Sequence, residues 1–297
     1  MRKLHFSSSP RVGFFGTNAS LFYAKHWLGQ ISLPCAAVGE IIDPKVIIRA
    51  GNPGEDAGEL ADDRPVSEII LWDFQSGRDG DGLHAAAAAG VSWVLGHDDA
   101  PPLALPIDIP EKWCGLVGAN LALSALLEAD LQGKTKARRV DISAADILRS
   151  FADQNAGNHT GVNASWRRNG SMAVEHGGIY PQGFFACRDG HVGIVGRSRK
   201  DWAAIRNVVG RPAWCEEERF DDPFALAANS AEVDVLLTQA FSKFDRDELL
   251  KRAIKFGATL APVYAANELE GRDVVRKDFF VENGKTNLPF EIVSRAS

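Results

Sequence analysis

The chain has 297 residues, of which 45% are hydrophobic and 24% are charged, and its formal net charge is −6. This composition is typical of one large or two moderate globular domains and excludes a disordered or fibrous chain. The acidic balance argues against nonspecific binding to nucleic acid, and no apolar run reaches the ~18–20 residues of a membrane span.

The first half of the sequence alternates between strands and helices, as an α/β domain does. Short apolar runs predict strands at 11–15, 31–38, 46–48, 69–74 and 140–143. Helical spacing of apolar residues predicts helices from 17–20 to about 28, at 84–94, over 111–131 and over 144–155. We therefore expect a large α/β domain over residues 1–154.

The second half has a different texture. Residues 155–171 are rich in Asn, Gly and Ser and predict a linker. Two apolar runs at 183–187 and 191–195 flank Asp189-Gly190 and predict a β-hairpin. Helices at 198–209, 230–243 and 245–257 and a strand at 260–264 complete the pattern. This part predicts a small α+β domain over 172–268, from which residues 269–297 return to the first domain.

Asp146 is the first candidate for chemistry. It stands three residues after Ser143, where a predicted strand gives way to a helix. The spacing alone favours a structural role, with Ser143 as helix cap and Asp146 in the first turn. The same position also suits a nucleophile, because a carboxylate near a helix N-terminus stays ionised and can attack an acyl carbon.

Two further segments allow two interpretations each. Gly177-Gly178-Ile179-Tyr180 is either a plain loop before the hairpin or a flexible segment whose N–H groups approach an acyl group. The basic turn that ends in Arg138 and Arg139 is either a solvated turn or a phosphate-binding cluster. The histidines are dispersed and the four cysteines lack CxxC spacing, so we expect no metal and a reducing, cytoplasmic setting.

These pieces occur in a familiar order. The basic turn is followed by RVDISAAD (139–146), and GGIYPQGFFACRDGHVGI (177–194) follows the linker. Together with the proline stretch before the long helix, they resemble the family III CoA-transferases (CaiB/BaiF). That family includes formyl-CoA transferase, carnitine CoA-transferase and the α-methylacyl-CoA racemases. The likeness extends from about residue 76 to residue 290.

The resemblance implies a Rossmann-like large domain, a smaller domain and two interlocked chains. It implies an enzyme that moves CoA from an acyl-CoA to a carboxylic acid, with CoA as substrate and acyl carrier. The site residues that it implies are the nucleophile Asp146, the oxyanion-binding Gly177 and Gly178, the substrate-binding Tyr180, and Arg138 and Arg139 for CoA.

The resemblance leaves alternatives open. The sequence is shorter than family members usually are, mainly before residue 76, where relatives carry much of their CoA-binding surface. The second hypothesis is therefore a non-catalytic or partner-dependent subunit that pairs with a longer paralogous chain. The enzyme of the first hypothesis is expected to form a homodimer. The third is an acyl-CoA racemase or lyase, although Asp81 stands where the racemases have a histidine and His84 follows three residues later. We expect no nucleic-acid or membrane partner.

Overall fold

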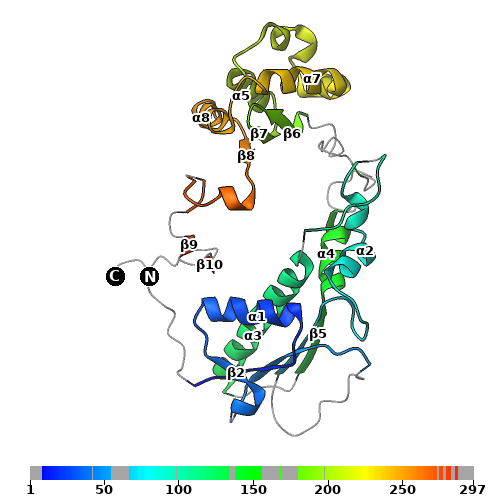
Figure 1. Cartoon of the computed structure of the whole chain (residues 1–297), viewed down its shortest axis with the longest axis vertical. Helices are drawn as coiled ribbons and strands as arrows, with labels where there is room; N and C mark the ends of the chain where they lie inside the picture. The colour runs from blue at the N-terminus through cyan, green and yellow to red at the C-terminus, as the bar shows by residue number, and fades with distance from the viewer. Residues whose placement is uncertain are drawn as a thin grey trace, which may run out of the picture. The chain divides into compact units, whose positions relative to one another are not determined.

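The computed structural model describes residues 9–41, 43–54, 67–97, 99–106, 108–133, 138–155, 168, 180–196, 198–272, 274–276, 279–281 and 285–286. The chain divides into two compact units (Figure 1). The first unit comprises Met1–Trp93, Leu103–Asn155 and Arg276–Ser297, and the second comprises Val94–Pro102 and Ala156–Val275. Each unit has a hydrophobic core of its own.

The first unit is built on a five-stranded parallel sheet, as the apolar runs predict. Its strands are β1 (Val12–Phe15), β2 (Cys35–Ala37), β3 (Val46–Ala50), β4 (Ser67–Trp72) and β5 (Arg138–Ser143). They lie in the order β2-β1-β3-β4-β5, and all neighbours pair in parallel. Because β2 and β3 lie on opposite sides of β1, the topological switch point falls between the carboxyl ends of β1 and β3. Open α/β sheets bind their ligands at such points.

Four α-helices and two short 3₁₀ turns accompany this sheet. They are α1 (Ala19–Gln30), η1 (Val38–Glu40), α2 (Gly82–Ala88), η2 (Ser92–Val94), α3 (Ile109–Gln132) and α4 (Ala144–Asn155). The helices α1 and α3 pack against each other and contact β3 and β4 (Figure 1). Their approach is close, since a Cβ at Gly115 of α3 would lie 2.5 Å from the backbone oxygen of Ser20 in α1.

One helix differs from its prediction. The Ala-rich pattern predicts a single helix over 84–94, but α2 ends at Ala88 and only a 3₁₀ turn follows. The physical reason is Gly90, whose φ of +80° lies in the left-handed region and ends the α-helix.

The second unit contains a three-stranded antiparallel sheet in the order β6-β7-β8. The hairpin of β6 (Gln182–Cys187) and β7 (Gly190–Val195) turns at Arg188 and Asp189, as the sequence predicts, and β8 (Leu260–Val263) pairs with β7. The other elements are α5 (Arg199–Val208), η3 (Ala213–Glu216), η4 (Glu218–Phe220), α6 (Pro223–Ala228), α7 (Ser230–Phe241), α8 (Arg246–Phe256) and η5 (Ala266–Glu268). Two short strands, β9 (Phe280–Val281) and β10 (Lys285–Thr286), pair in the segment that belongs to the first unit.

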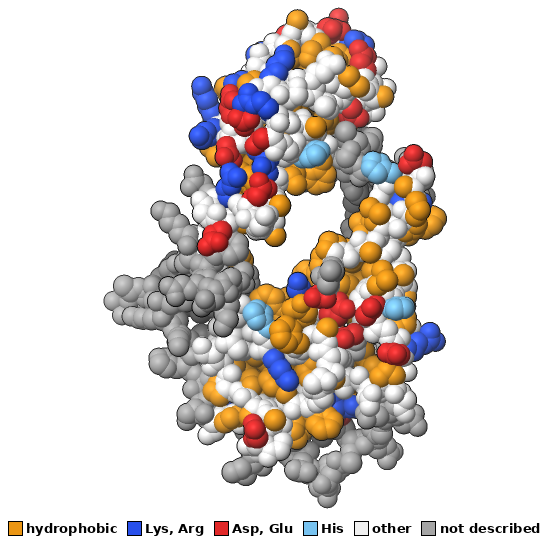
Figure 2. All heavy atoms as spheres, viewed as in Figure 1, with side chains coloured by type: hydrophobic (Ala, Val, Ile, Leu, Met, Phe, Trp, Pro, Cys, Tyr) orange, Lys and Arg blue, Asp and Glu red, His pale blue; other side chains and the backbone are white. Residues whose placement is uncertain are grey.

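Alternating side chains decide which face of the small sheet is buried. Phe185, Val192 and Ile194 point into the core with Trp202 of α5, while Phe184 stays 57% exposed. The surface of this unit carries interleaved acidic and basic side chains (Figure 2). There the guanidinium of Arg246, in α8, donates a hydrogen bond to the carboxylate of Glu268, in η5. This bond lowers the pKa of Glu268 to about 2.

Candidate active site

Asp146 lies just beyond the carboxyl end of β5, in the first turn of α4. Its carboxylate oxygen Oδ2 accepts a hydrogen bond from the Ser143 hydroxyl at 2.6 Å, and Ser143 Oγ accepts the Asp146 N–H at 3.1 Å. Ser143 is buried, whereas the Asp146 side chain is 68% exposed. The two sequence interpretations are therefore compatible, because the capping pair leaves an accessible carboxylate in a fixed orientation.

Arg149 completes the surroundings of this carboxylate. Its Nη1 donates to Asp146 Oδ1 at 2.7 Å. With its amide assigned the orientation that satisfies both groups, Gln75, just after β4, directs its oxygen toward Arg149 and accepts from Nη1 at 3.3 Å and from Nη2 at 2.5 Å. Neither Arg149 nor Gln75 is among the site residues predicted from the sequence. The i, i+3 spacing on one helix was a usable signal for the arginine, whereas nothing in the sequence pairs Gln75 with α4.

A backbone hydrogen bond joins the first turn of α4 to the segment that follows β4. The N–H of Ala145 donates to the backbone oxygen of Phe74 at 3.1 Å. The ring of Phe74 in turn lies 5.7 Å from the ring of His84, centroid to centroid. Nδ1 of His84 lies 2.7 Å from a carboxylate oxygen of Asp81, and this hydrogen bond lowers the pKa of Asp81. His84, three residues after the position where the racemases have their histidine, thus stands at the same edge of the sheet as α4.

Helix N-termini at this edge are already bound by the chain's own carboxylates. Asp73, which follows β4, accepts the N–H groups of Ala19 and Ser20 at 3.0 and 2.8 Å. Glu111 accepts the N–H of Gly82 at 2.6 Å, and its other carboxylate oxygen has no partner among the described residues. Burial raises the pKa of Glu111. These N–H groups are therefore already occupied by carboxylates of the chain itself.

The other predicted site residues lie at the amino end of β5, in the second unit, or outside the described residues. Gly177 and Gly178 fall among the residues that the structure does not describe. Tyr180 is fully buried in the core of the second unit, where its hydroxyl donates to the backbone oxygen of Ser230 at 3.2 Å and to the carboxylate of Asp234. Burial raises the pKa of Tyr180. A role for Tyr180 in substrate binding stays a prediction.

Arg138 and Arg139 occupy the opposite end of β5 from Ser143. At ~3.3 Å per residue, the length of the strand separates Arg138 from Ser143 by about 17 Å. Arg138 is paired with Glu128 at 2.9 Å and Arg139 with Asp141 at 3.0 Å. Binding of a phosphate by either arginine competes with these ion pairs, and their role toward CoA stays a prediction.

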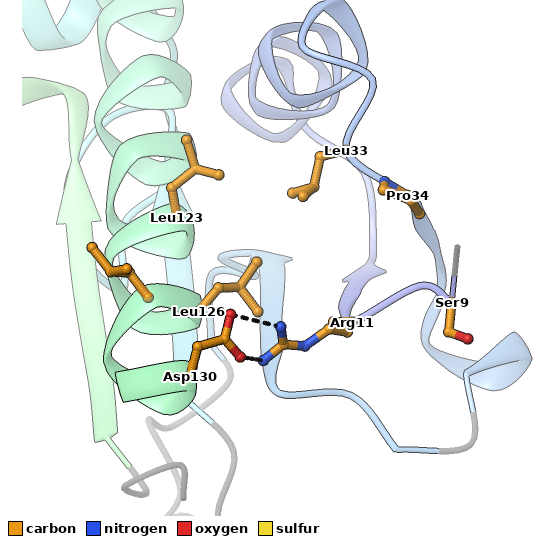
Figure 3. Close-up of a pocket in the computed structure, with 8 residues that line it drawn as sticks. Ser9, Arg11, Leu33, Pro34, Leu123, Leu126 and Asp130 are labelled. Atoms are coloured by element: carbon orange, nitrogen blue, oxygen red, sulfur yellow. Dashed lines mark hydrogen bonds and ion pairs between the residues drawn. The ribbon is translucent and has the colours of Figure 1, made fainter. Parts of the chain in front are cut away.

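A pocket of about 170 Å³ lies at the amino edge of the same sheet (Figure 3). Leu33 and Leu126 line it, and the guanidinium of Arg11 reaches across it to Asp130 with two bonds of 2.6 and 3.0 Å. Pockets for small-molecule ligands usually measure ~300–1,000 Å³. This pocket is therefore too small for an acyl-CoA and lies at the wrong end of the strands for chemistry at Asp146.

Among the described residues, no group of three or more His, Cys, Asp or Glu side chains is placed to hold a metal ion. The expectation of a metal-free site stays a prediction.

Comparisons with known proteins agree with this architecture. A search of curated protein sequences found no match. A CAIB/BAIF family protein from Brucella suis has a similar structure, with a TM-score of 0.63, 20% identity, and coverage of 78% of this chain and 63% of that one. The hypothetical protein Rv3272 from Mycobacterium tuberculosis has a TM-score of 0.66, 20% identity, and coverage of 84% and 70%.

The chain thus spans less than two thirds of the Brucella suis protein. At this level of identity, the two structures establish the fold: a parallel α/β sheet unit with a small antiparallel sheet unit. Membership follows from the sequence itself, because residues 74–295, three quarters of the chain, match the model of the family described as CoA-transferase family III. The chain therefore belongs to CoA-transferase family III.

Proposed function

We propose that this chain is a CoA-transferase that moves CoA from an acyl-CoA thioester to a free carboxylic acid, with Asp146 as the nucleophile. The observation that supports this proposal is the state of that side chain. Its carboxylate is 68% exposed, is oriented by Ser143 at 2.6 Å, and stands at the carboxyl edge of a parallel sheet. A carboxylate in this position is accessible to a thioester carbonyl and rigid enough to attack it.

The reaction divides into balanced acyl transfers. The Asp146 carboxylate attacks the thioester carbonyl, which forms a mixed anhydride and expels the CoA thiolate. The thiolate then attacks the aspartyl carbonyl, which gives an aspartyl-CoA thioester and releases the first acid as its carboxylate. The second acid repeats these two steps in reverse order and leaves as the new acyl-CoA. Each step consumes one anion and releases one, so no proton has to be supplied.

The topology suggests where acyl-CoA lies. Its natural crevice is the switch point between the carboxyl ends of β1 and β3. With strands ~4.8 Å apart, β5 lies about 12 Å from the middle of that crevice along the same edge. An acyl-CoA is extended, with its thioester at the end remote from the nucleotide, so a nucleotide in the crevice is compatible with a thioester at Asp146. Gly177 and Gly178 are proposed to donate N–H groups to the developing oxyanions.

The test uses acyl-CoA labelled in the CoA part and mass spectrometry of the intact protein. Without an acceptor acid, the parent protein is expected to gain the mass of CoA less that of one water on Asp146, and with an acceptor it is expected to release labelled acyl-CoA. Asp146→Asn and Asp146→Ala are expected to do neither. Asp201→Asn is the matched control, because Asp201 has the same bonds to Ser198 at the start of α5. Transfer that survives in Asp146→Ala overturns the proposal.

We also propose that two copies of the chain assemble. Contrary to the expectation from the sequence, α3 is long and apolar enough to cross a membrane by length and composition, as core helices of soluble proteins also are. It supports an assembly because only 39% of its most apolar window is buried. Trp113, Leu127 and Leu131 are 43%, 59% and 78% exposed on it at heptad spacing. Between them, Asn120 Nδ2 and Ser124 Oγ donate to backbone oxygens of their own helix, so these donors stay satisfied when the face is covered.

The assembly test also separates the enzyme from a partner-dependent subunit. Light scattering of the purified chain is expected to give the mass of a dimer, and the double change Leu127→Glu with Leu131→Glu is expected to give a monomer. The subunit role is established instead if the parent protein alone is monomeric and takes up no CoA label, but forms a complex and takes up the label when a longer paralogous chain is added. Solvent deuterium that enters the α-carbon of an acyl-CoA establishes a racemase or lyase.

A further inference from the structure

The guanidinium of Arg149 is held between two elements that are far apart in the sequence. On one side its Nη1 donates to Asp146 Oδ1 at 2.7 Å, and on the other both terminal nitrogens face the amide oxygen of Gln75. The side chain is 39% exposed, so a small molecule can reach it. Among the residues that the structure describes, the carboxylate of Asp146 is the one anion with which Arg149 forms an ion pair.

Geometry brings an acid substrate to this guanidinium. The acceptor carboxylate has to approach the aspartyl carbonyl carbon to ~3–3.5 Å before the bond forms. That carbon carries the oxygen which Arg149 Nη1 contacts at 2.7 Å. An attacking carboxylate therefore arrives next to Arg149. The planar fork of arginine fits a carboxylate with two parallel hydrogen bonds, which a lysine does not provide.

The charge balance of the reaction leads to the same residue. In the free enzyme the negative charge beside Arg149 belongs to Asp146. When Asp146 is converted to its CoA thioester, its side chain loses the negative charge, whereas Arg149 keeps its positive charge. An incoming carboxylate then restores the ion pair at the moment when it is needed for attack. The released carboxylate of the first acid occupies the same position in the preceding step.

We propose that Arg149, oriented by Gln75, is the binding residue for the carboxylate of the acid substrate, and that it exchanges this carboxylate with that of Asp146 during each turnover. This inference rests on the proposed function for its place in the reaction. The ligand of Arg149 is the carboxylate group of the acid, whatever the rest of that acid is.

A binding measurement tests the site without turnover. Asp146→Asn removes the competing charge and imitates the acylated residue. With fluorinated butyrate as the probe, followed by ¹⁹F NMR, this variant is expected to bind at least fivefold more tightly than the parent protein. The double change Asp146→Asn with Arg149→Met is expected to abolish saturable binding. Equal binding by the single and the double variant overturns the proposal.

Kinetics supply the second readout. Arg149→Met is expected to raise the KM for the acceptor acid at least tenfold relative to the KM for acyl-CoA, and millimolar guanidinium ion is expected to reverse part of this change. Arg149→Lys is expected to fall between Arg149→Met and the parent protein. Arg11→Met is the matched control, because Arg11 is also ion-paired but lies at the amino edge of the sheet. A ratio of the two KM values that stays within twofold in Arg149→Met overturns the proposal.

The two proposals fail separately. Carboxylate binding that depends on Arg149 in a protein without transferase activity sustains the binding site and overturns the proposed function. Transferase activity that depends on Asp146 but not on Arg149 sustains the proposed function and overturns the binding site.

Discussion

Replacing Ser143 by alanine separates the structural role of the strand-to-helix junction from its chemical role. The Ser143 hydroxyl makes two bonds at once, accepting the Asp146 N–H at 3.1 Å and donating to Asp146 Oδ2 at 2.6 Å. The same pair recurs at the start of α5, where Ser198 accepts the N–H of Asp201 at 3.2 Å and donates to its carboxylate at 3.0 Å. Ser198→Ala is therefore a control with matched local geometry.

The expected magnitude follows from these contacts. Loss of a serine N-cap costs ~1 kcal/mol, with a range of about 0.5–2 kcal/mol. The bond to the carboxylate adds little to folding stability, because Asp146 is 68% exposed and water replaces the hydroxyl. Both variants are thus expected to lose about 1 kcal/mol, with Ser143→Ala the larger because Ser143 is buried. In the substrate-covered site, a hydrogen bond to a charged group is worth ~1.5 kcal/mol, or about tenfold in rate.

The assay combines urea unfolding with the steady-state rate of acyl transfer. Ser143→Ala is expected to lose about tenfold in kcat/KM, because the carboxylate is no longer held in one orientation. Ser198→Ala is expected to lose less than about twofold, at a similar cost in stability. Equal activity losses in the two variants, or full activity in Ser143→Ala, contradict the role of the hydroxyl in orienting the nucleophile.

Three further predictions concern packing and titration. Gly115→Ala is expected to destabilise the protein by about 1–3 kcal/mol, because its Cβ meets the backbone of α1. Gly29→Ala, with no atom within 4 Å of the new Cβ, is expected to stabilise the protein by about 0.5–1 kcal/mol. Urea unfolding in which the stabilities of both variants shift in the same direction contradicts this prediction. Burial raises the pKa of Glu111 above its usual 4.5. Ionised Glu111 therefore lowers the folding stability. This loss is absent below the pKa of the unfolded chain and grows as the pH rises toward the pKa of the folded protein. The stability of Glu111→Gln relative to the parent protein is therefore expected to increase as the pH rises above 4.5 in thermal unfolding, and a constant difference contradicts the burial of an ionised group. Tyr180→Phe leaves the Asp234 carboxylate without its donor and is expected to lose about 1–3 kcal/mol in thermal unfolding, whereas a loss below about 0.5 kcal/mol shows that water replaces the hydroxyl.

Much of the fold was predictable because it is encoded over short distances in the sequence. Apolar runs between turn residues predict the five parallel strands, and Arg188-Asp189-Gly190 between two apolar runs predicts the β6–β7 hairpin, although Gly190 itself pairs with Cys187. The prediction failed over 84–94, where an unbroken alanine pattern hides the effect of one glycine with positive φ. The candidate site was predictable to the same extent, since the spacing of Ser143 and Asp146 is a local signal for their hydrogen bonds.

The sequence by itself determined the order of the elements, the capping pair at the start of α4 and, through the ordered motifs, the family. Only the tertiary structure decided that Gln75 meets Arg149 and that Tyr180 faces Asp234 inside the second core. The physical reason is the range of the interactions. Helix periodicity and capping depend on neighbours within a few residues, whereas a bond between residues more than 50 positions apart depends on how whole elements pack.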